Sequence, residues 1–318
     1  MKALAARFVP AADEVHGLQV GKGPEGDLFR KIAEQGHYAG RTRPSSTRQG
    51  IYAAAPSGRL LASINSNRPD QMADMLRKAL AVWETLPKEE RLLPGEVPAS
   101  PPDRWRWESK YPTDGLVLKV TSRDVGREGA RGDDWPARAW NRDFAWFKRG
   151  EARSLLPVEI AAGAEHEVPA ALVRRIARLH LVDDVRGQTQ PYEDAQVTSA
   201  SLRAEVVKVE EGNATLRFEG ASATHQEGRW PIGGQKEGPP EPQVRGFEGT
   251  WLGRATYDLK AERFTSFEMV VVGLRTGATR YNARDDDLGP APMGYVFALA
   301  GDAPSEHVPP AAVWGYGW

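Results

Sequence analysis

Residues 202–220 read LRAEVVKVEEGNATLRFEG, in which two alternating segments flank Gly212 and Asn213. Alternation of apolar and polar residues places their side chains on opposite faces of a strand, and a short Gly/Asn turn joins two antiparallel strands. This stretch therefore predicts a β-hairpin, and it makes the last third of the chain a β domain.

The chain continues with segments of the same kind. Residues 251–258 and 263–272 form two apolar segments around a turn at 259–262, and residues 295–300 form one more. At least five strands, mostly antiparallel, predict a curved sheet or half-barrel that packs on the helix preceding it.

That helix is expected at residues 169–181, where a proline begins an amphipathic pattern. Residues 116–121 alternate and predict a strand. Residues 94–102 carry four prolines without periodicity and predict a linker.

Aromatic side chains are dense in the segment that follows this linker. Trp140, Phe144 and Phe147 recur at helical spacing and predict a helix over residues 137–147. Packed aromatic rings of this kind are typical of a seam between domains.

The first 93 residues predict four elements in sequence. Residues 4–9 form a short apolar run suited to a strand, and residues 24–35 have helical spacing. Residues 49–64 predict a hairpin around a Pro/Gly turn, and an amphipathic helix is expected from Pro69 onward.

This order of strand, helix, hairpin and helix resembles the second half of the thioredoxin fold. The turn Ala55-Pro-Ser-Gly-Arg-Leu-Leu61 looks like the hairpin of that family, and the resemblance covers residues 1–93 only. The cysteine pair of the family is absent, and Ser46-Thr-Arg-Gln-Gly50 stands where its cis-proline would be. The resemblance therefore implies an incomplete thioredoxin-like module without dithiol chemistry.

Together these patterns predict an α+β chain in four parts. Residues 1–93 form the thioredoxin-like α/β module, 94–102 the linker, 103–198 an aromatic-rich mixed segment with helices, and 199–318 an antiparallel β domain. The combination also resembles uncharacterised extracytoplasmic proteins of environmental bacteria that join a thioredoxin-like half to a β domain.

The composition excludes several classes of function. With 42 Lys and Arg against 43 Asp and Glu, the net charge is −1, so no overall field attracts nucleic acid. The absence of cysteine excludes disulfides, Cys-ligated zinc, iron–sulfur clusters and thiol catalysis in this chain. No cofactor is predicted.

Hydropathy predicts no membrane span, because no apolar stretch approaches the ~20 residues that a spanning helix needs. The N-terminal residues also lack the apolar core of a signal peptide. We expect a soluble protein, cytoplasmic as written, and periplasmic or secreted if an upstream signal has been lost.

Two charged segments are candidate ion sites. Arg41, Arg43 and Arg48 lie among hydroxyl residues without an acid, a composition that suits phosphate or sulfate. Asp285, Asp286 and Asp287 form the most acidic cluster and predict either a hard-cation site or a solvated acidic loop.

A third polar group combines Asp183, Asp184 and Arg186 with His180 and Tyr192. It predicts either an interdomain salt-bridge network or, if burial shifts a carboxyl pKa, a general acid or base.

An apolar ligand site is expected on the β domain. Trp251, Tyr257 and Phe267 are its candidate residues. Alternation puts Phe264 and Phe267 on opposite faces, and a sheet that is apolar on both faces is covered on both or holds a ligand.

The chain lacks Gly-x-Ser-x-Gly, His-Glu-x-x-His and Walker A motifs. This favours a non-catalytic binding or scaffold protein whose partner is another protein or a small apolar ligand. The alternatives are a degenerate or truncated thioredoxin-like oxidoreductase whose cysteine motif is missing from this chain and a metal-dependent hydrolase.

Overall fold

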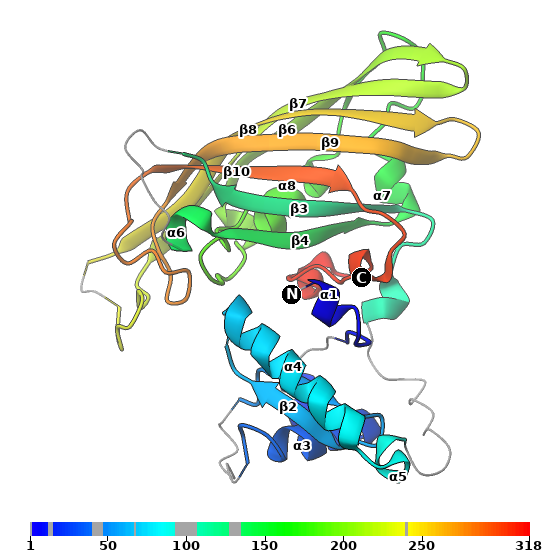
Figure 1. Ribbon diagram of the computed structural model, residues 1–318. Helices are drawn as coiled ribbons and strands as arrows, with labels where there is room; N and C mark the ends of the chain where they lie inside the picture. The colour runs from blue at the N-terminus through cyan, green and yellow to red at the C-terminus, as the bar shows by residue number, and fades with distance from the viewer. Residues whose placement is uncertain are drawn as a thin grey trace. The chain divides into compact units, whose positions relative to one another are not determined.

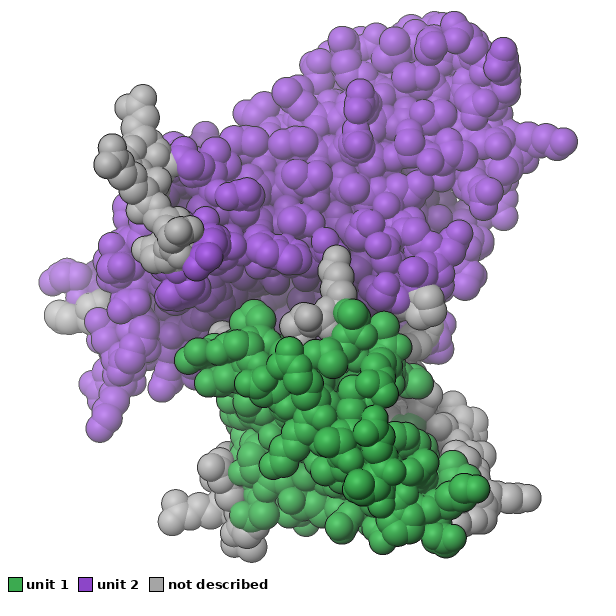
Figure 2. Space-filling model, viewed as in Figure 1, with its two compact units in different colours: residues 1–105 green, residues 106–318 purple. Residues whose placement is uncertain are grey.

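The computed structural model describes residues 2–11, 15–39, 47–66, 68–92, 107–126, 135–238 and 241–318. These residues belong to two units, 1–105 and 106–318 (Figures 1 and 2). The predicted linker, residues 94–102, lies outside the described residues.

Unit 1 contains a two-stranded sheet and helices packed around it (Figure 1). Its elements are α1 Lys2–Ala5, α2 Val15–Val20, α3 Pro24–Glu34, β1 Ile51–Ala54, β2 Leu60–Ile64, α4 Pro69–Thr85 and α5 Lys88–Arg91. The predicted hairpin and the helices on either side of it are confirmed. Their likeness to a thioredoxin-like module stays a prediction.

The predicted strand over residues 4–9 is wrong, because the chain forms α1 there and then turns. Residues 3–6 are three alanines and a leucine, the residues with the highest intrinsic helix propensity. Among the described residues, the sheet of unit 1 also holds only β1 and β2, so this segment has no strand to pair with.

Unit 2 is built on one eight-stranded antiparallel sheet. The strands lie in the order β4-β3-β10-β9-β8-β7-β6-β5, with edges at β4 and β5, so the sheet is open. Its elements are η1 Trp107–Lys110, β3 Leu116–Asp124, α6 Trp135–Arg138, β4 Trp140–Phe147, α7 Arg149–Arg153, β5 Glu165–Glu167, α8 Ala170–His180, η2 Asp194–Gln196, β6 Val197–Glu210, β7 Asn213–Gly228, β8 Gln243–Asp258, β9 Arg263–Thr276, β10 Ala291–Leu299, η3 Pro304–Glu306 and η4 Val313–Tyr316.

The hairpin of β6 and β7 lies within this sheet and is confirmed. Glu210 pairs with Asn213, so the turn residues are Glu211 and Gly212, one position earlier than predicted. Both have positive φ, 50° and 78°. A turn with two successive positive φ values matches the twist of antiparallel strands. Gly212 adopts its positive φ without strain because glycine has no Cβ.

One face of the sheet and α8 form the main core (Figure 1). Val173 and Ile176 of α8 pack in the same cluster as Phe218, Trp251 and Phe297 of the strands. We call the face toward α8 the inner face and the opposite one the outer face.

A β-bulge alters the expected alternation on β9. Tyr257 pairs with Phe264 but Thr256 pairs with Ser266, so Thr265 is an extra residue. The bulge turns Phe264 to the inner face beside Phe267, and their rings lie 5.6 Å apart. The expectation that these two aromatics face opposite sides is therefore wrong.

The predicted helix over 137–147 is also wrong, because residues 140–147 form β4. Ala145 and Phe147 join the main core, whereas Phe144 and Trp146 are buried against the C-terminal segment. A strand buried on both faces loses its alternation, so its aromatic spacing resembles that of a helix.

The C-terminal residues cover the free edge of β4. Trp146 donates its backbone N–H to the Tyr316 hydroxyl at 3.1 Å. Arg175 donates to the Trp146 carbonyl at 3.1 Å. Edge strands present unpaired backbone groups, and these two side chains satisfy those of Trp146.

Adjacent valines of β6 test the assignment of the two faces. Val206 is fully buried and Val207 is 49% exposed. We expect Val206→Ala to lower the free energy of unfolding by about 2 kcal/mol, since it removes buried methyl groups and leaves a cavity. Val207→Ala should change it by less than about 1 kcal/mol. Urea unfolding followed by tryptophan fluorescence measures both, and equal losses would contradict the assignment.

Candidate functional site

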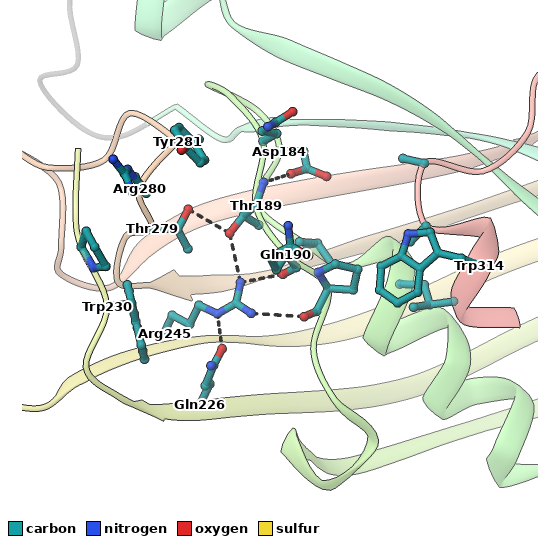
Figure 3. A pocket seen from close by; sticks show the side chains of 17 residues that line it. Asp184, Thr189, Gln190, Gln226, Trp230, Arg245, Thr279, Arg280, Tyr281 and Trp314 are labelled. Atoms are coloured by element: carbon teal, nitrogen blue, oxygen red, sulfur yellow. Dashed lines mark hydrogen bonds between the residues drawn. The ribbon is translucent and has the colours of Figure 1, made fainter. Parts of the chain in front are cut away.

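A pocket of about 450 Å³ lies at one end of the sheet in unit 2 (Figure 3). Residues 182–191, which follow α8, form one wall, and Thr279, Arg280 and Tyr281 form another. The ends of β7 and β8 contribute Gln226 and Arg245. The pocket thus gathers segments that are far apart in the sequence.

Arg245 forms the floor of the pocket, where it is almost completely buried. Its Nε donates to the Gln226 side chain at 2.5 Å, and its Nη1 donates to Thr189 Oγ1 at 3.0 Å and to the Gln190 carbonyl at 2.7 Å. Its Nη2 donates to the Pro191 carbonyl at 3.2 Å, and the guanidinium lies 4.5 Å from the Tyr192 ring. Burial lowers the pKa of Arg245. Most of its donors therefore hold the pocket wall in place.

Asp184 supplies the one carboxyl group of the pocket lining among the described residues. Its Oδ1 accepts a hydrogen bond from the Thr189 backbone N–H at 2.6 Å, and its Oδ2 has no hydrogen-bond partner among these residues. Burial raises the pKa of Asp184 to about 7, and the nearby charges of Asp143 and Asp183 add to the effect. Near neutral pH this carboxyl can both donate and accept hydrogen bonds.

Aromatic rings stand on two sides of the pocket. Figure 3 shows Trp230 and Trp314 on opposite sides of Arg245. The Trp230 indole is fixed, because its N–H donates to the Ala278 carbonyl at 2.8 Å. Trp314 and Tyr281 are 59% and 60% exposed. Large exposed rings at the rim of a polar pocket are typical of a binding site.

A buried chain of hydrogen bonds positions Trp314. Asp143 Oδ2 lies 2.8 Å from His180 Nδ1, and His180 Nε2 lies 2.6 Å from the Tyr316 hydroxyl. Asp143 Oδ1 accepts the Ala311 backbone N–H at 2.8 Å. These contacts hold the residues before and after Trp314 against α8 and β4.

An ion-pair cluster fixes the loop that carries Thr279 and Tyr281. Arg284 is fully buried, and it pairs with Asp124 at 2.7 Å, with Asp183 at 2.8 Å and with Asp287 at 3.2 Å. Burial alone would lower the pKa of Arg284, but the hydrogen bonds that it donates to Asp124 and Asp183 raise this pKa overall. Arg186 and Arg275 also pair with Asp287, so three arginines balance three aspartates.

The predicted network around residues 180–192 thus separates into different environments. Asp183 and Arg186 belong to the ion-pair cluster, His180 to the hydrogen-bond chain and Asp184 to the pocket. Consecutive aspartates point to different partners, a difference that the sequence does not reveal.

The candidate anion site is described only in part. Arg41 and Arg43 lie outside the described residues. Arg48 pairs with Glu34 at 2.9 Å, and the Tyr52 hydroxyl donates to its carbonyl at 2.7 Å.

The candidate cation site separates in the same way. Asp287 is engaged by arginines, whereas Asp285 and Asp286 are exposed. Among the described residues, no group of three or more His, Asp or Glu side chains is placed to hold a metal ion. The cation site stays a prediction.

The candidate apolar ligand residues lie in the interior. Trp251, Tyr257 and Phe267 are buried in the main core, and the Trp251 indole donates to Ser222 Oγ at 3.1 Å. The Phe267 ring packs against Phe218, and the Tyr257 ring packs against Phe264.

Most residues of the pocket carry no sequence signal. The aromatic C-terminal sequence and the Asp183–Asp184 pair attract attention, but Gln226, Arg245 and Thr279 resemble ordinary strand and loop residues. Only pairing of β7 with β8 brings Gln226 opposite Arg245.

Comparisons with protein-family models, curated proteins and solved structures find no match to this chain. In the described part of the chain, no helix is both long and apolar enough to cross a membrane.

The Asp184 carboxyl should make stability depend on pH. Its folded-state pKa of about 7 lies above the usual 3.8, so between these values the folded chain keeps a proton that the unfolded chain has lost. Stability from this group therefore falls as pH rises through the window, by at most about 1.4 kcal/mol per pH unit.

We expect Asp184→Asn to match the wild type near about pH 4 and to be increasingly more stable up to about pH 8, because it removes the buried charge. Urea unfolding across this range measures the difference. Asp286→Asn, an exposed change, should show no such trend, and a pH-independent difference for Asp184→Asn would contradict the burial of this group.

Loss of the Arg284 guanidinium should leave Asp124 and Asp183 as poorly compensated buried charges. We expect Arg284→Met to lower the free energy of unfolding by about 3–5 kcal/mol. Arg203→Met removes an exposed pair with Glu165 and should cost less than about 1 kcal/mol. Similar small losses for both variants in urea unfolding would show that the cluster does not fix the loop.

Proposed function

We propose that unit 2 binds a small, uncharged, polyhydroxylated molecule, such as a sugar, in this pocket, and that the protein does not transform it. The observation that carries the proposal is the combination of exposed indole and phenol rings with planar hydrogen-bonding groups around one hollow. A volume of about 450 Å³ suits a ligand of one or two sugar rings.

The chemistry of a sugar complements this lining. The C–H face of a sugar ring is apolar and packs on an aromatic ring, whereas its hydroxyls need donors and acceptors directed at them. Trp314 offers an exposed ring, and Gln188, Gln190 and the free oxygen of Asp184 offer polar groups.

Charged ligands are less well supported. Arg245 donates most of its N–H groups to other residues of the protein, so this side chain keeps few donors for an anion. A cation would be repelled by Arg245 and Arg280, which both line the pocket.

The arrangement favours binding over hydrolysis. Cleavage of a glycosidic bond generally uses two carboxyl groups on either side of the bond. Asp184 is the one carboxyl among the described lining residues, and Asp183 is engaged by Arg284 and Asn282. The described residues of the lining include no second carboxyl group to serve as acid or base.

The test uses a panel of neutral mono- and disaccharides with the purified chain, in thermal-shift screening followed by isothermal titration calorimetry. We expect at least one saccharide to raise the melting temperature and to bind with measurable heat. Trp314→Ala should weaken its binding by about tenfold or more, because it removes the ring on which the ligand stacks.

Trp135→Ala is the matched control, since Trp135 is 57% exposed and does not line the pocket. It should leave saccharide binding unchanged. The proposal is overturned if no saccharide in the panel binds or if binding survives Trp314→Ala at full strength.

A further inference from the structure

The outer face of the sheet carries exposed aliphatic side chains on three adjacent strands. We call them the outer patch: Leu252, Val270, Val272, Leu274 and Val296, which are 42–60% exposed. The register joins them, because Leu252 lies opposite Val270 and Val270 lies opposite Val296. A contiguous exposed apolar surface marks a site of interaction. None of these residues lines the pocket described above.

The outward-facing positions of these three strands are arranged evenly about an inward row. Trp251, Val271 and Tyr295 form a row of directly paired residues whose side chains point to the inner face. On each of the three strands, two outward-facing positions lie on either side of this row; on β8 they are 248 and 250 on one side and 252 and 254 on the other. Consider a two-fold axis that lies above this row, parallel to the outer face and perpendicular to the strands. It would place the outer faces of two copies opposite each other, with outward positions of one copy over outward positions of the other.

Charges at the ends of the patch are complementary about this axis. Glu248 and Arg254 are both exposed on β8, three residues to either side of Trp251. The axis places Glu248 of one copy over Arg254 of the other, and the symmetry repeats the pair. Glu248 has no ion pair among the described residues, whereas Arg254 pairs with Glu268 at 2.7 Å on an exposed surface. The second copy would thus supply Glu248 with a partner.

Gly294 on β10 presents no side chain to the outer face, and Val125 and Val272 border it. The same axis places Val296 of the second copy over Gly294. A branched side chain above a glycine is the kind of fit that packed sheets use.

Two arrangements with the axis along the strands bring like charges together. An axis along the strands above β9 places Glu268 over its own copy, and one between β9 and β10 places Arg254 over Lys119 of the other copy. Like charges in a desolvated interface are costly, so the perpendicular axis is favoured over these two arrangements.

We propose that this protein forms a homodimer in which the outer patches of two copies pack face to face about that perpendicular axis. The contact is isologous, as in most two-subunit proteins, and joins two sheets in the manner of a β-sandwich. It does not rest on the proposed ligand, and Trp314→Ala should dimerise like the wild type.

Sedimentation velocity of the full chain over a range of concentrations tests the proposal. We expect a species of twice the 34.9 kDa chain mass that dissociates on dilution. Val272→Lys, which puts a charge in the centre of the patch, should raise the dissociation constant by about tenfold or more. Val207→Lys, an equally exposed valine on β6 outside the patch, should leave it unchanged.

A charge reversal tests the orientation. Glu248→Arg should weaken dimerisation, and adding Arg254→Glu should restore it, because the pair is then re-formed with opposite signs. Circular dichroism and melting temperature show whether each variant folds. A wild type that stays monomeric at every concentration, a dimer indifferent to Val272→Lys, or a double variant no tighter than the single one would each overturn the proposal.

Discussion

The packing of α8 on the inner face of the sheet is the interaction on which the rest of unit 2 depends. An open antiparallel sheet must remove one apolar face from water, and α8 is the main helix that covers this face. The chain leaves α8 at its C-terminal end and passes directly into residues 182–191, which form a wall of the pocket. The position of the candidate site is therefore a consequence of how the core is closed.

Two buried polar networks then fix two segments that the main core does not hold in place. The cluster around Arg284 holds the 277–290 loop, and the chain from Asp143 through His180 to Tyr316 holds the C-terminal segment. Neither loop has strands to fix its conformation, and buried charges tolerate few alternative arrangements because each must keep its partners. These networks give the pocket walls a defined geometry, and Asp184 lines the pocket with one carboxyl oxygen that accepts no hydrogen bond from the described residues.

The two faces and the end of the sheet have separate roles in this interpretation. The inner face forms the main core, the pocket at one end of the sheet is the proposed ligand site, and the outer patch is the proposed dimer contact. The alternation of residues predicts an apolar surface on both faces of the sheet, and the outer face is indeed partly apolar. Its exposed apolar residues are valines and leucines, whereas the predicted aromatics are absent from this patch. The bulge at Thr265 is the reason, because one extra residue moves Phe264 to the inner face.

Local pattern by itself determined much of this protein. Alternation predicted β6 to β10, turn residues predicted the hairpins, and amphipathic spacing predicted α3, α4 and α8, because each of these signals arises within a single element. Tertiary structure decided the rest. It made a strand of residues 140–147, whose burial on both faces erases the alternation, and it separated Asp183 from Asp184. It also brought Gln226 opposite Arg245 to build the pocket floor, since long-range pairing and burial depend on residues that the local sequence does not contain.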